Sequence, residues 1–464
     1  MRSTLGFTLA AMVGWLELTA AAGSSTPFRA GASRAQPVRW DSLPAAIQRR
    51  LTASGVDARS FPVFCRNHEQ RTLERVRESD LDALIYYALQ STSFTSDPPI
   101  EPALSAKASV EAGGGVPEPA ERRLRALVPA LRTPPPASRL AYFRGVLDRE
   151  TSDASQLDAF LRQEYTRATR FLYAKEFVAP REPDSAAAVA ALYRSRGLST
   201  DTAVEAGYLV HVGLATLQAL EPTRRIRRVL IIGPGLDLAP RTGLVEAGPP
   251  ESYQPYAVVD SLVGLGLSRS DDLTVVGADV NPRVVGHLEA ATNREVSLAL
   301  VTSVGDSETV TLEEDYRRYF TTLGGSIGDA TAAPTLPDRY RGHLRKSVRI
   351  RREVSRVIEA LRLDAVTERV DGGAFDLVVA TNVFPYLDDV PLALALANIA
   401  AVLTPGGVLL HNEARPLVGD VTADLGLPLE HARTATIARV RAGTPLYDRV
   451  FMHVKTRAGR AGLR

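Results

Sequence analysis

Apolar residues change their spacing about halfway along the chain. Before residue 221 they recur mostly every three or four positions, which is the pattern of amphipathic helices. Helices are expected over Leu43–Ala53, Glu69–Gln90, Leu140–Arg149, Gln156–Phe177, Ala186–Arg196 and Thr200–Leu220. Residues 40–220 are therefore predicted to form a mostly helical region.

One stretch inside this region lacks the helical spacing. Residues 95–137 collect proline, glycine and alanine, with Pro98-Pro99, Gly113-Gly114-Gly115 and Pro134-Pro135-Pro136 as the clearest interruptions. Such clusters are typical of turns and linkers. We predict a linker or long loop here, with one short helix near Glu121–Leu131.

Beyond residue 221, short β-branched apolar runs alternate with helix-like stretches. Strands are predicted at Arg228–Ile232, Leu273–Asp279, Phe375–Ala380 and Gly407–His411, with one more, unplaced, between residues 295 and 363. This alternation favours a parallel sheet with both faces covered. Thr434–Val440 and Tyr447–Lys455 predict a closing antiparallel pair. The expected fold class is α/β: a Rossmann-like sheet over residues 221–464, mostly parallel with an antiparallel edge.

The first residues have the form of a secretory signal. Arg2 supplies positive charge, Leu5–Leu16 is an apolar run too short to span a membrane, and residues 19–23 are small. We predict a signal peptide or membrane anchor over residues 1–22. Export or anchoring is the expectation, and membrane association would use this segment only. The alternative is an alanine-rich start to a cytoplasmic protein.

Composition narrows the function classes. With 464 residues and 45% hydrophobic content, the chain can build a core. Its single cysteine, Cys65, excludes intramolecular disulfides and cysteine-cluster zinc sites. The 55 basic and 53 acidic residues nearly balance, so no nucleic-acid partner is expected.

Two glycines, Gly233 and Gly235, follow the first predicted strand. Glycines there let the backbone turn sharply and let a ligand approach it closely. A dinucleotide fingerprint would need a third glycine, but that position is Leu238, which disfavours a dehydrogenase. Asp237 would repel a pyrophosphate, so the loop suits a cationic or zwitterionic ligand better.

Polar residues also stand at the ends of the later strands. Asp279 ends the second strand, where an acid can accept hydrogen bonds from ribose hydroxyls; a helix N-cap is the alternative. Asp364 and Ala365 precede the next strand and could reach an adenine. Asn382 and Tyr386 follow that strand at the carboxyl edge of the sheet, with loop capping and packing as the alternative role.

Two pairs of potential metal ligands are incomplete. Cys65 with His68, and His411 with Glu413, each supply only two ligands, too few for a zinc site. Cys65 and His68 are expected to be a buried thiol beside a surface histidine. No metal site is predicted.

Several segments stand in the order of a known family. Tyr319-Phe320, Leu344–Ile350, Phe375–Leu387 and Leu403–Glu413 are similar to its "YF", "LR-x-x-V-x-F", "FDLI-x-x-RNV-x-x-YF" and "L-x-PGG…HSE" segments. Over about residues 225–413 the chain resembles the class I S-adenosylmethionine (SAM)-dependent methyltransferases. The closer resemblance is to the chemotaxis-receptor (CheR-type) glutamate methyltransferases, although Thr381 stands where that family has arginine.

The resemblance implies SAM as the cofactor and a role for each candidate residue. Gly233 and Gly235, with Asp237, would lie by the methionine part of SAM. Asp279 would hold the ribose. Asp364 and Ala365 would lie near the adenine. Asn382 would lie by the cofactor, and Tyr386, near the transferred methyl, would be the catalytic residue.

The expected function is methyl transfer from SAM to an unknown acceptor, either a carboxylate or another oxygen or nitrogen nucleophile. Such transfer depends mainly on positioning, so it needs no dedicated strong base for a carboxylate acceptor. The alternative is a methyltransferase-fold protein without catalysis, acting as an exported binding or scaffold protein, because SAM is a cytoplasmic metabolite. Residues 40–210 directly precede the sheet and are placed to cover the cofactor site.

Overall fold

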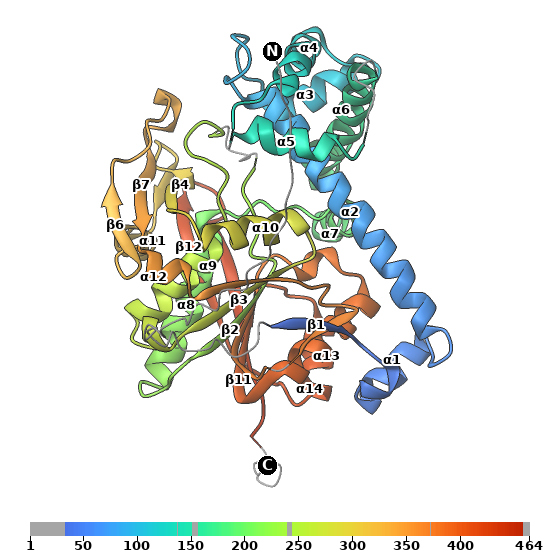
Figure 1. Ribbon diagram of the computed structural model, residues 1–464, viewed down its shortest axis with the longest axis vertical. Coiled ribbons are helices and arrows are strands. Elements are labelled where there is room, and N and C mark those ends of the chain that lie inside the picture. Colours follow the sequence, from blue (N-terminus) through green and yellow to red (C-terminus); the bar gives the residue numbers. More distant parts are fainter. Residues whose placement is uncertain (1–32, 137, 151–155, 239–243, 372, 458–464) are drawn as a thin grey trace, which may run out of the picture. The chain divides into compact units, whose positions relative to one another are not determined.

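The computed structural model describes residues 33–464 except 137, 151–155, 239–243, 372 and 458–464 (Figure 1). Residues from Ser33 onward form one compact unit. The predicted signal or anchor over residues 1–22 lies outside the described residues. Within the described ranges, no helix combines the length and the apolar character that crossing a bilayer requires.

The main sheet has eight strands. Its parallel part has the order β8-β3-β2-β10-β11, and β13, β12 and β5 continue it with antiparallel pairing. The strands are β2 (Arg228–Ile232), β3 (Thr274–Asp279), β5 (Val310–Leu312), β8 (Ile358–Arg362), β10 (Phe375–Ala380), β11 (Leu403–His411), β12 (Leu429–Val440) and β13 (Leu446–Val454). The predicted Rossmann-like sheet with an antiparallel edge is confirmed, and the unplaced strand is β8.

Alternate residues of the central strands face two separate cores. On β2, Val229 and Ile231 join one core, whereas Leu230 and Ile232 join the other, because successive side chains of a strand point to opposite faces. The first core includes α8 (Val204–Leu220), α9 (Gln254–Gly264) and α10 (Pro282–Ala291). The second includes α1 (Ala45–Ala53), α13 (Asp389–Val402) and α14 (Pro416–Asp424). The parallel strands are therefore covered on both faces, as their continuous apolar sequences predict.

A smaller sheet is inserted between α10 and β8. Its antiparallel order is β4-β7-β6, formed by β4 (Ser297–Gly305), β6 (Gly328–Thr331) and β7 (His343–Ile350). The same insert contains α11 (Glu314–Thr322), and α12 (Arg352–Ser355) follows it. Elsewhere β1 (Arg34–Pro37) pairs with β9 (Glu368–Asp371), so the first described residues join the C-terminal half of the chain.

The helical region is arranged around one long helix, α2 (Phe61–Gln90). The second half of α2, from Ser79 to Gln90, is buried throughout, whereas most of its first half is exposed. The other helices of the region are α3 (Pro102–Glu111), α4 (Glu118–Arg132), α5 (Arg139–Leu147), α6 (Leu157–Tyr173) and α7 (Ser185–Ser195). Figure 1 shows α3 to α6 gathered around the C-terminal half of α2.

Two helices occupy most of residues 95–137: α4 corresponds to the short helix predicted near Glu121–Leu131, whereas α3 lies where a linker or loop is predicted. Prolines stand in the first turns of both α3 and α4, where a missing backbone N–H breaks no helical hydrogen bond. Gly113 and Gly114 end α3 with positive φ angles of 76° and 89°. The small residues allow close packing: Ala106 is fully buried, and the Ser105 hydroxyl lies 2.8 Å from the Tyr165 hydroxyl of α6.

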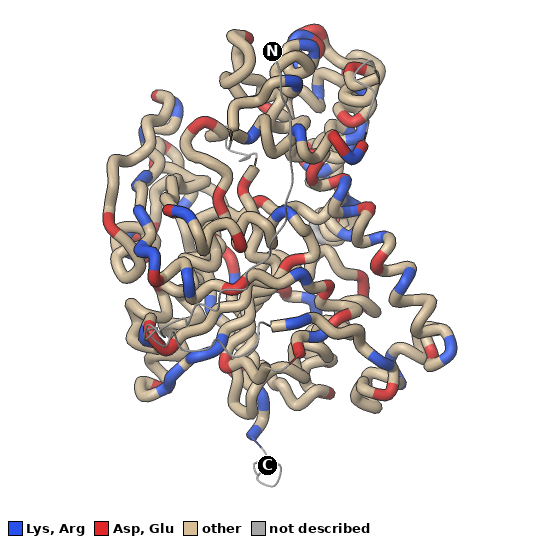
Figure 2. Tube along the Cα trace, viewed as in Figure 1, with Lys and Arg blue, Asp and Glu red and all other residues tan. Residues whose placement is uncertain are grey.

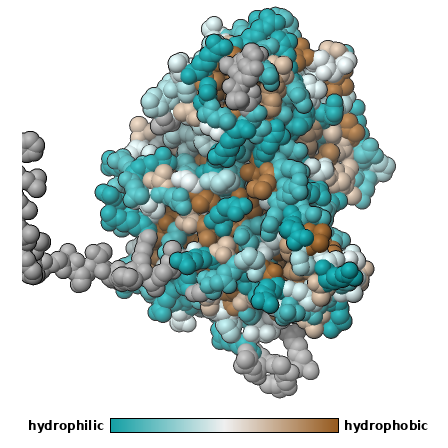
Figure 3. Space-filling model, turned by 45° about the vertical axis from the view of Figure 1, so that its right-hand side comes forward, coloured by the Kyte–Doolittle hydropathy of each residue, from teal (hydrophilic) through white to brown (hydrophobic). Residues whose placement is uncertain are grey.

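Charges and apolar side chains on the surface are mixed. Figure 2 shows basic and acidic residues interspersed along α2. On the face in Figure 3, hydrophobic patches are interrupted by hydrophilic residues. Exposed large apolar side chains such as Val63 and Leu73 occur singly along α2, and isolated ones need no partner to explain them.

Buried ion pairs attach α2 to the rest of the chain. Asp80, 1% exposed, pairs with Arg283 of α10 and accepts a hydrogen bond from Asn281 Nδ2 at 3.2 Å. Asp82 lies 2.8 Å from Arg167 of α6 and 3.7 Å from Arg196. A buried carboxylate without partners is strongly destabilising, so these contacts fix where α2 lies against the sheet.

Arg123 of α4 is fully buried and donates hydrogen bonds to backbone carbonyls at the C-terminal end of α2. Its guanidinium donates to the Ala88 carbonyl at 2.8 Å, to the Asp97 and Pro98 carbonyls at 2.5 and 3.1 Å, and to the Ser91 carbonyl. The carbonyls at a helix C-terminus lack partners within the helix. Arg123 therefore supplies donors that the fold around residues 88–98 requires.

We expect Arg123→Met to lower the free energy of unfolding by about 3 kcal/mol, because it leaves several buried carbonyls without donors. Urea denaturation measures the change. The matched control is Arg122→Met, since the Arg122 side chain is 47% exposed and its ion pairs with Asp97 and Glu118 are long, 3.6 Å each. That change should cost less than about 1 kcal/mol. Equal effects of the two substitutions would contradict the role of Arg123.

Candidate functional site

A cavity of about 120 Å³ lies at the carboxyl ends of the parallel strands. The chain passes from β2 to β3 and β8 on one side of β2 and then crosses to β10 on the other side, so the strand order reverses beside β2. Ligands of open α/β sheets bind at such a switch point. Seven of the eight predicted site residues line this cavity: Gly233, Gly235, Asp279, Asp364, Ala365, Asn382 and Tyr386. We refer to it as the first cavity.

The glycine loop after β2 is in close contact with the segment that precedes α8. Gly233 and Gly235 have φ angles of 69° and 75°, which side chains disfavour. A Cβ atom on Gly235 would lie 2.5 Å from the Thr200 carbonyl oxygen. Leu236 and Thr200 exchange two hydrogen bonds, each 2.8 Å long. Residues 198–202 are thereby held over the loop and line the first cavity with it.

Asp279 ends β3 with its side chain 8% exposed. One carboxylate oxygen accepts the Asn281 backbone N–H at 2.8 Å. Burial raises the pKa of this carboxyl to about 6, although backbone hydrogen bonds from Asn281, Gly235 and Val280 act in the opposite direction. The helix N-cap that follows is Asn281, whose side chain accepts from Arg283 N. Asp279 is therefore not the N-cap residue of α10, and its carboxylate lines the first cavity.

Asp364 meets a histidine from α2. His68 Nε2 lies 3.4 Å from Asp364 Oδ2, and both residues line the first cavity. Burial acts to raise the pKa of Asp364, but the His68 contact and the Val366 N–H lower it below its usual value overall. The expectation of a surface histidine beside Cys65 is wrong, since the His68 side chain is only 12% exposed.

Asn382 adopts a left-handed backbone conformation with φ of 59°. Asn tolerates this region better than most residues, and strain of this kind is common at functional sites. The conformation is held by Asn412, which accepts the Asn382 N–H at 2.9 Å and donates Nδ2 to Asn382 Oδ1 at 2.7 Å. Asn412 follows β11, so the end of one strand positions the loop of the next.

Tyr386 is fixed from the helical region. Arg75 of α2 donates to the carbonyls of Tyr386 and Tyr193, each at 3.0 Å, and to that of Arg196 at 2.7 Å. Its guanidinium also lies 5.8 Å from the Tyr386 ring centre. Burial lowers the pKa of Arg75 to about 10, still well above neutrality. One side chain therefore joins α2, the end of α7 and the loop after β10.

Gln254, at the start of α9, is a lining residue that the sequence did not indicate. It is 1% exposed and donates Nε2 to Thr381 Oγ1 at 2.5 Å. Its Oε1 is buried and has no hydrogen-bond partner within the described part of the chain. A buried acceptor without a donor is costly, so it favours a ligand that brings one.

Asp237 belongs to a second, larger cavity and not to the first. This second cavity encloses about 470 Å³ and shares Ser199, Asp201, Thr202, Asn382 and Tyr386 with the first. Asp237 N donates to the Glu251 carbonyl at 2.9 Å, which turns the residue away from the glycine loop. The structure therefore separates Asp237 from the other predicted cofactor residues.

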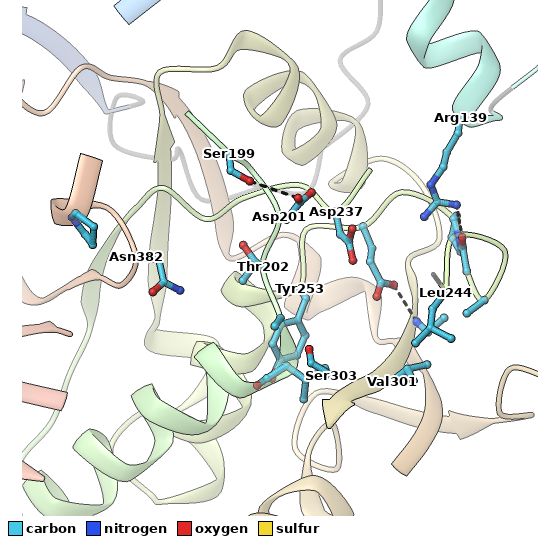
Figure 4. A pocket seen from close by; sticks show the side chains of 18 of the residues that line it. Arg139, Ser199, Asp201, Thr202, Asp237, Leu244, Tyr253, Val301, Ser303 and Asn382 are labelled. Carbon is cyan, nitrogen blue, oxygen red and sulfur yellow. Dashed lines mark hydrogen bonds between the residues drawn. The ribbon is translucent and has the colours of Figure 1, made fainter. Parts of the chain in front are cut away.

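The acids of the second cavity have raised pKa values. Burial raises the pKa of Asp237 well above its usual range and Asp201 raises it further, while Arg139 lowers it. Burial raises the pKa of Glu251 to about 7, against the Ala299 N–H and Arg139, which lower it. Figure 4 shows the Asp201 and Asp237 carboxylates close together, with Arg139 reaching in from another direction.

His411 and Glu413 do not form a ligand pair. His411 is 1% exposed, stacks on His453 with ring centres 4.9 Å apart, and has its pKa lowered to about 3 by burial and by His453. Glu413 instead accepts the Arg415 N–H at 3.0 Å. In residues 33–457 as described, no group of three or more potential ligands could hold a metal ion.

No family model and no curated protein matches the chain. Solved structures that align with it include the N-methyltransferase NodS from Bradyrhizobium japonicum WM9 in complex with S-adenosylhomocysteine (14% identity, 53% of this chain, 85% of that chain, TM-score 0.26). Another is magnesium protoporphyrin IX methyltransferase from Synechocystis PCC 6803 with bound SAM (10% identity, 54% of this chain, 81% of that chain, TM-score 0.26). A third is a TehB-like SAM-dependent methyltransferase from Corynebacterium glutamicum (13% identity, 53% of this chain, 88% of that chain, TM-score 0.25). At such TM-scores the likeness carries no weight for the cofactor or the acceptor.

The segment over both cavities depends on a close backbone approach at Gly197. A Cβ atom there would lie 2.5 Å from Ser79 N and 2.9 Å from the Arg75 carbonyl oxygen. We expect Gly197→Ala to destabilise the protein by about 1–3 kcal/mol, because backbone must move. Hydrogen exchange at residues 198–202 should quicken as the segment loosens.

The control is Gly145→Ala on α5, where a Cβ would meet nothing within 4 Å. Alanine favours helix more than glycine, so this change should stabilise by about 0.5–1 kcal/mol. Thermal denaturation of both variants shows whether each substitution raises or lowers the stability of the protein. A neutral Gly197→Ala variant would show that the approach to α2 is not a constraint.

Proposed function

We propose that this protein is a SAM-dependent methyltransferase whose first cavity holds the cofactor. The observation that carries the proposal is the convergence of seven predicted residues, from four strand ends, on one cavity at the switch point of the sheet.

The residues present fit the parts of SAM. The Asp279 carboxylate would accept hydrogen bonds from the ribose hydroxyls, as acids at this strand end do for nucleotides. Asp364, oriented by His68, and Ala365 would lie beside the adenine. Gln254 Oε1, which has no donor of its own, would accept from the ammonium group of the methionine part.

Asn382 and Tyr386 stand at the border of the two cavities and would flank the transferred methyl. SAM supplies an electrophilic methyl group on its sulfonium sulfur. The protein's contribution is to hold the acceptor in the second cavity, in line with that methyl group. The order of the segments from Tyr319 to Glu413 supports a relation to CheR-type enzymes, while the acceptor need not be a receptor carboxylate.

Binding of SAM would require the first cavity to widen. Its volume of about 120 Å³ is below the roughly 300–1,000 Å³ of pockets that enclose a ligand of this size. Thr72 and Arg75 of α2 and Tyr386 form part of the lining, and Arg75 donates to the Tyr386 carbonyl at 3.0 Å. Cofactor entry would therefore displace α2 side chains.

We expect Asp279→Ala to weaken SAM and S-adenosylhomocysteine binding about 10- to 100-fold, because the ligand loses its hydrogen bonds to a charged carboxylate. Isothermal titration calorimetry on the full chain measures it. Asp260→Asn is the matched control: it is a buried aspartate on α9 that accepts two backbone N–H groups, each at 2.9 Å, outside the cavity. Unaltered affinity in Asp279→Ala, or no binding by folded wild-type protein, would contradict the proposal.

The raised pKa of Asp279 predicts a pH dependence of SAM affinity. The ionised carboxyl accepts the ribose hydrogen bonds, and protonation below its pKa of about 6 removes an acceptor. Affinity should be flat above about pH 7 and fall about tenfold per unit below about pH 6. Asp364, another carboxyl, lines the same cavity, so an internal reference is needed.

Asp279→Asn provides that reference. It keeps the size of the side chain and cannot titrate, so any pH dependence that it retains belongs to the other groups. Calorimetry from pH 4.5 to 8 on both proteins separates the two contributions. Identical pH profiles would show that Asp279 does not hold the ligand in its ionised form.

A further inference from the structure

The second cavity is placed to receive the methyl acceptor. It adjoins the first along five shared lining residues, so a molecule within it would touch whatever the first cavity presents at that border. Its volume of about 470 Å³ is in the range of pockets that enclose metabolite-sized molecules. The inserted sheet supplies one wall through Ala299, Val301 and Ser303 of β4.

Acidic side chains predominate among the charged residues of this cavity. Asp201, Asp237 and Glu251 line it, and Arg139 is the one basic residue among its described lining. Two donors of Arg139 are already engaged, because Nε donates to the Leu238 carbonyl at 2.8 Å and Nη1 to the Gly248 carbonyl at 2.5 Å. Arg139 therefore braces the backbone of the cavity and compensates only part of the acidic charge.

One acceptor in the cavity lacks a donor. Asp237 Oδ1 is shielded from solvent and has no hydrogen-bond partner among the described residues. Its backbone is fixed by the bridge to Glu251, so the side chain stays in place. A shielded carboxylate oxygen without a donor favours a ligand that carries N–H groups or positive charge.

The occupant is better matched by an organic cation than by a metal ion. In the described part of the chain these carboxylates do not form a group that could hold a metal. Three tyrosines, Tyr193, Tyr253 and Tyr386, also line the cavity, and aromatic faces attract organic ammonium groups. A carboxylate acceptor would instead meet three acids and a guanidinium that is largely engaged.

Resting on the proposed methyl transfer, we propose that the second cavity binds an acceptor bearing a primary or secondary amine, which the carboxylates of Asp201, Asp237 and Glu251 recognise. Before transfer the ammonium group gives one proton to one of these carboxylates. The amine nitrogen then uses its freed electron pair to form a bond to the methyl carbon. The carbon–sulfur bond breaks, its electron pair stays on sulfur, and the products are an N-methylated ammonium and a neutral thioether.

The test uses phenethylamine and 3-phenylpropionate, which share a ring and a short chain and differ in charge. Saturation-transfer NMR is recorded with full-length protein saturated with S-adenosylhomocysteine. Phenethylamine should bind and 3-phenylpropionate should not. This comparison needs no variant, so a folding defect in a mutant leaves it decisive.

Variants then locate the binding. Asp237→Asn with Glu251→Gln removes two carboxyls that can ionise beside an ammonium group and keeps an oxygen acceptor at each position, and it should weaken phenethylamine binding at least tenfold. Affinity for S-adenosylhomocysteine should change less than twofold, since neither residue lines the first cavity. Asp260→Asn serves as the control carboxyl outside both cavities.

The outcomes separate the two proposals. Failure of the wild-type protein to bind S-adenosylhomocysteine overturns the methyltransferase proposal itself. Cofactor binding with no binding of phenethylamine, or with equal binding of 3-phenylpropionate, overturns only the amine assignment. Phenethylamine binding that the double substitution leaves unchanged also overturns it, because the amine would then lie elsewhere.

Discussion

The pairing of the buried Asp80 with Arg283 and Asn281 fixes the long helix α2 against the carboxyl edge of the sheet. A carboxylate that is 1% exposed requires partners, and here Arg283 and Asn281 provide them at the start of α10. Asn281 also donates its N–H to Asp279. One contact thus joins α2 to the turn that orients the predicted ribose acid. The helical region therefore contributes to the site together with the sheet.

The rest of the site follows from that attachment. Once Asp80 is fixed, His68 and Arg75 on the same helix reach Asp364 and the carbonyl of Tyr386. Gly197 lets residues 198–202 cross α2 closely enough to line both cavities. The sheet supplies the glycine loop and the strand-end acids, whereas α2 and the segment before α8 supply the cover. Two cavities with a shared border are the result.

Local patterns predicted what depends on neighbours in sequence. The parallel strands, the glycine loop and the strand ends of Asp279 and Asn382 follow from residue spacing, and the fold class is confirmed. Long-range partners carry no local signal: nothing in α2 indicates that His68 meets Asp364. Asp237, two residues after Gly235, was grouped with the loop, but its bridge to Glu251 turns it into the second cavity. The helix α3 escapes prediction because a proline that begins a helix cannot be distinguished by local sequence from a proline in a linker.

We propose that the sheet edge and α2 bind one ligand together. Hydrogen–deuterium exchange of the full chain, with and without saturating S-adenosylhomocysteine, tests it most directly. The account predicts slower exchange in the ligand-bound protein at residues 233–236 and 279–281, and also at 68–75 and 198–202. Protection of the strand ends without any change in α2 would contradict the shared site. Protection at neither would contradict the cofactor assignment.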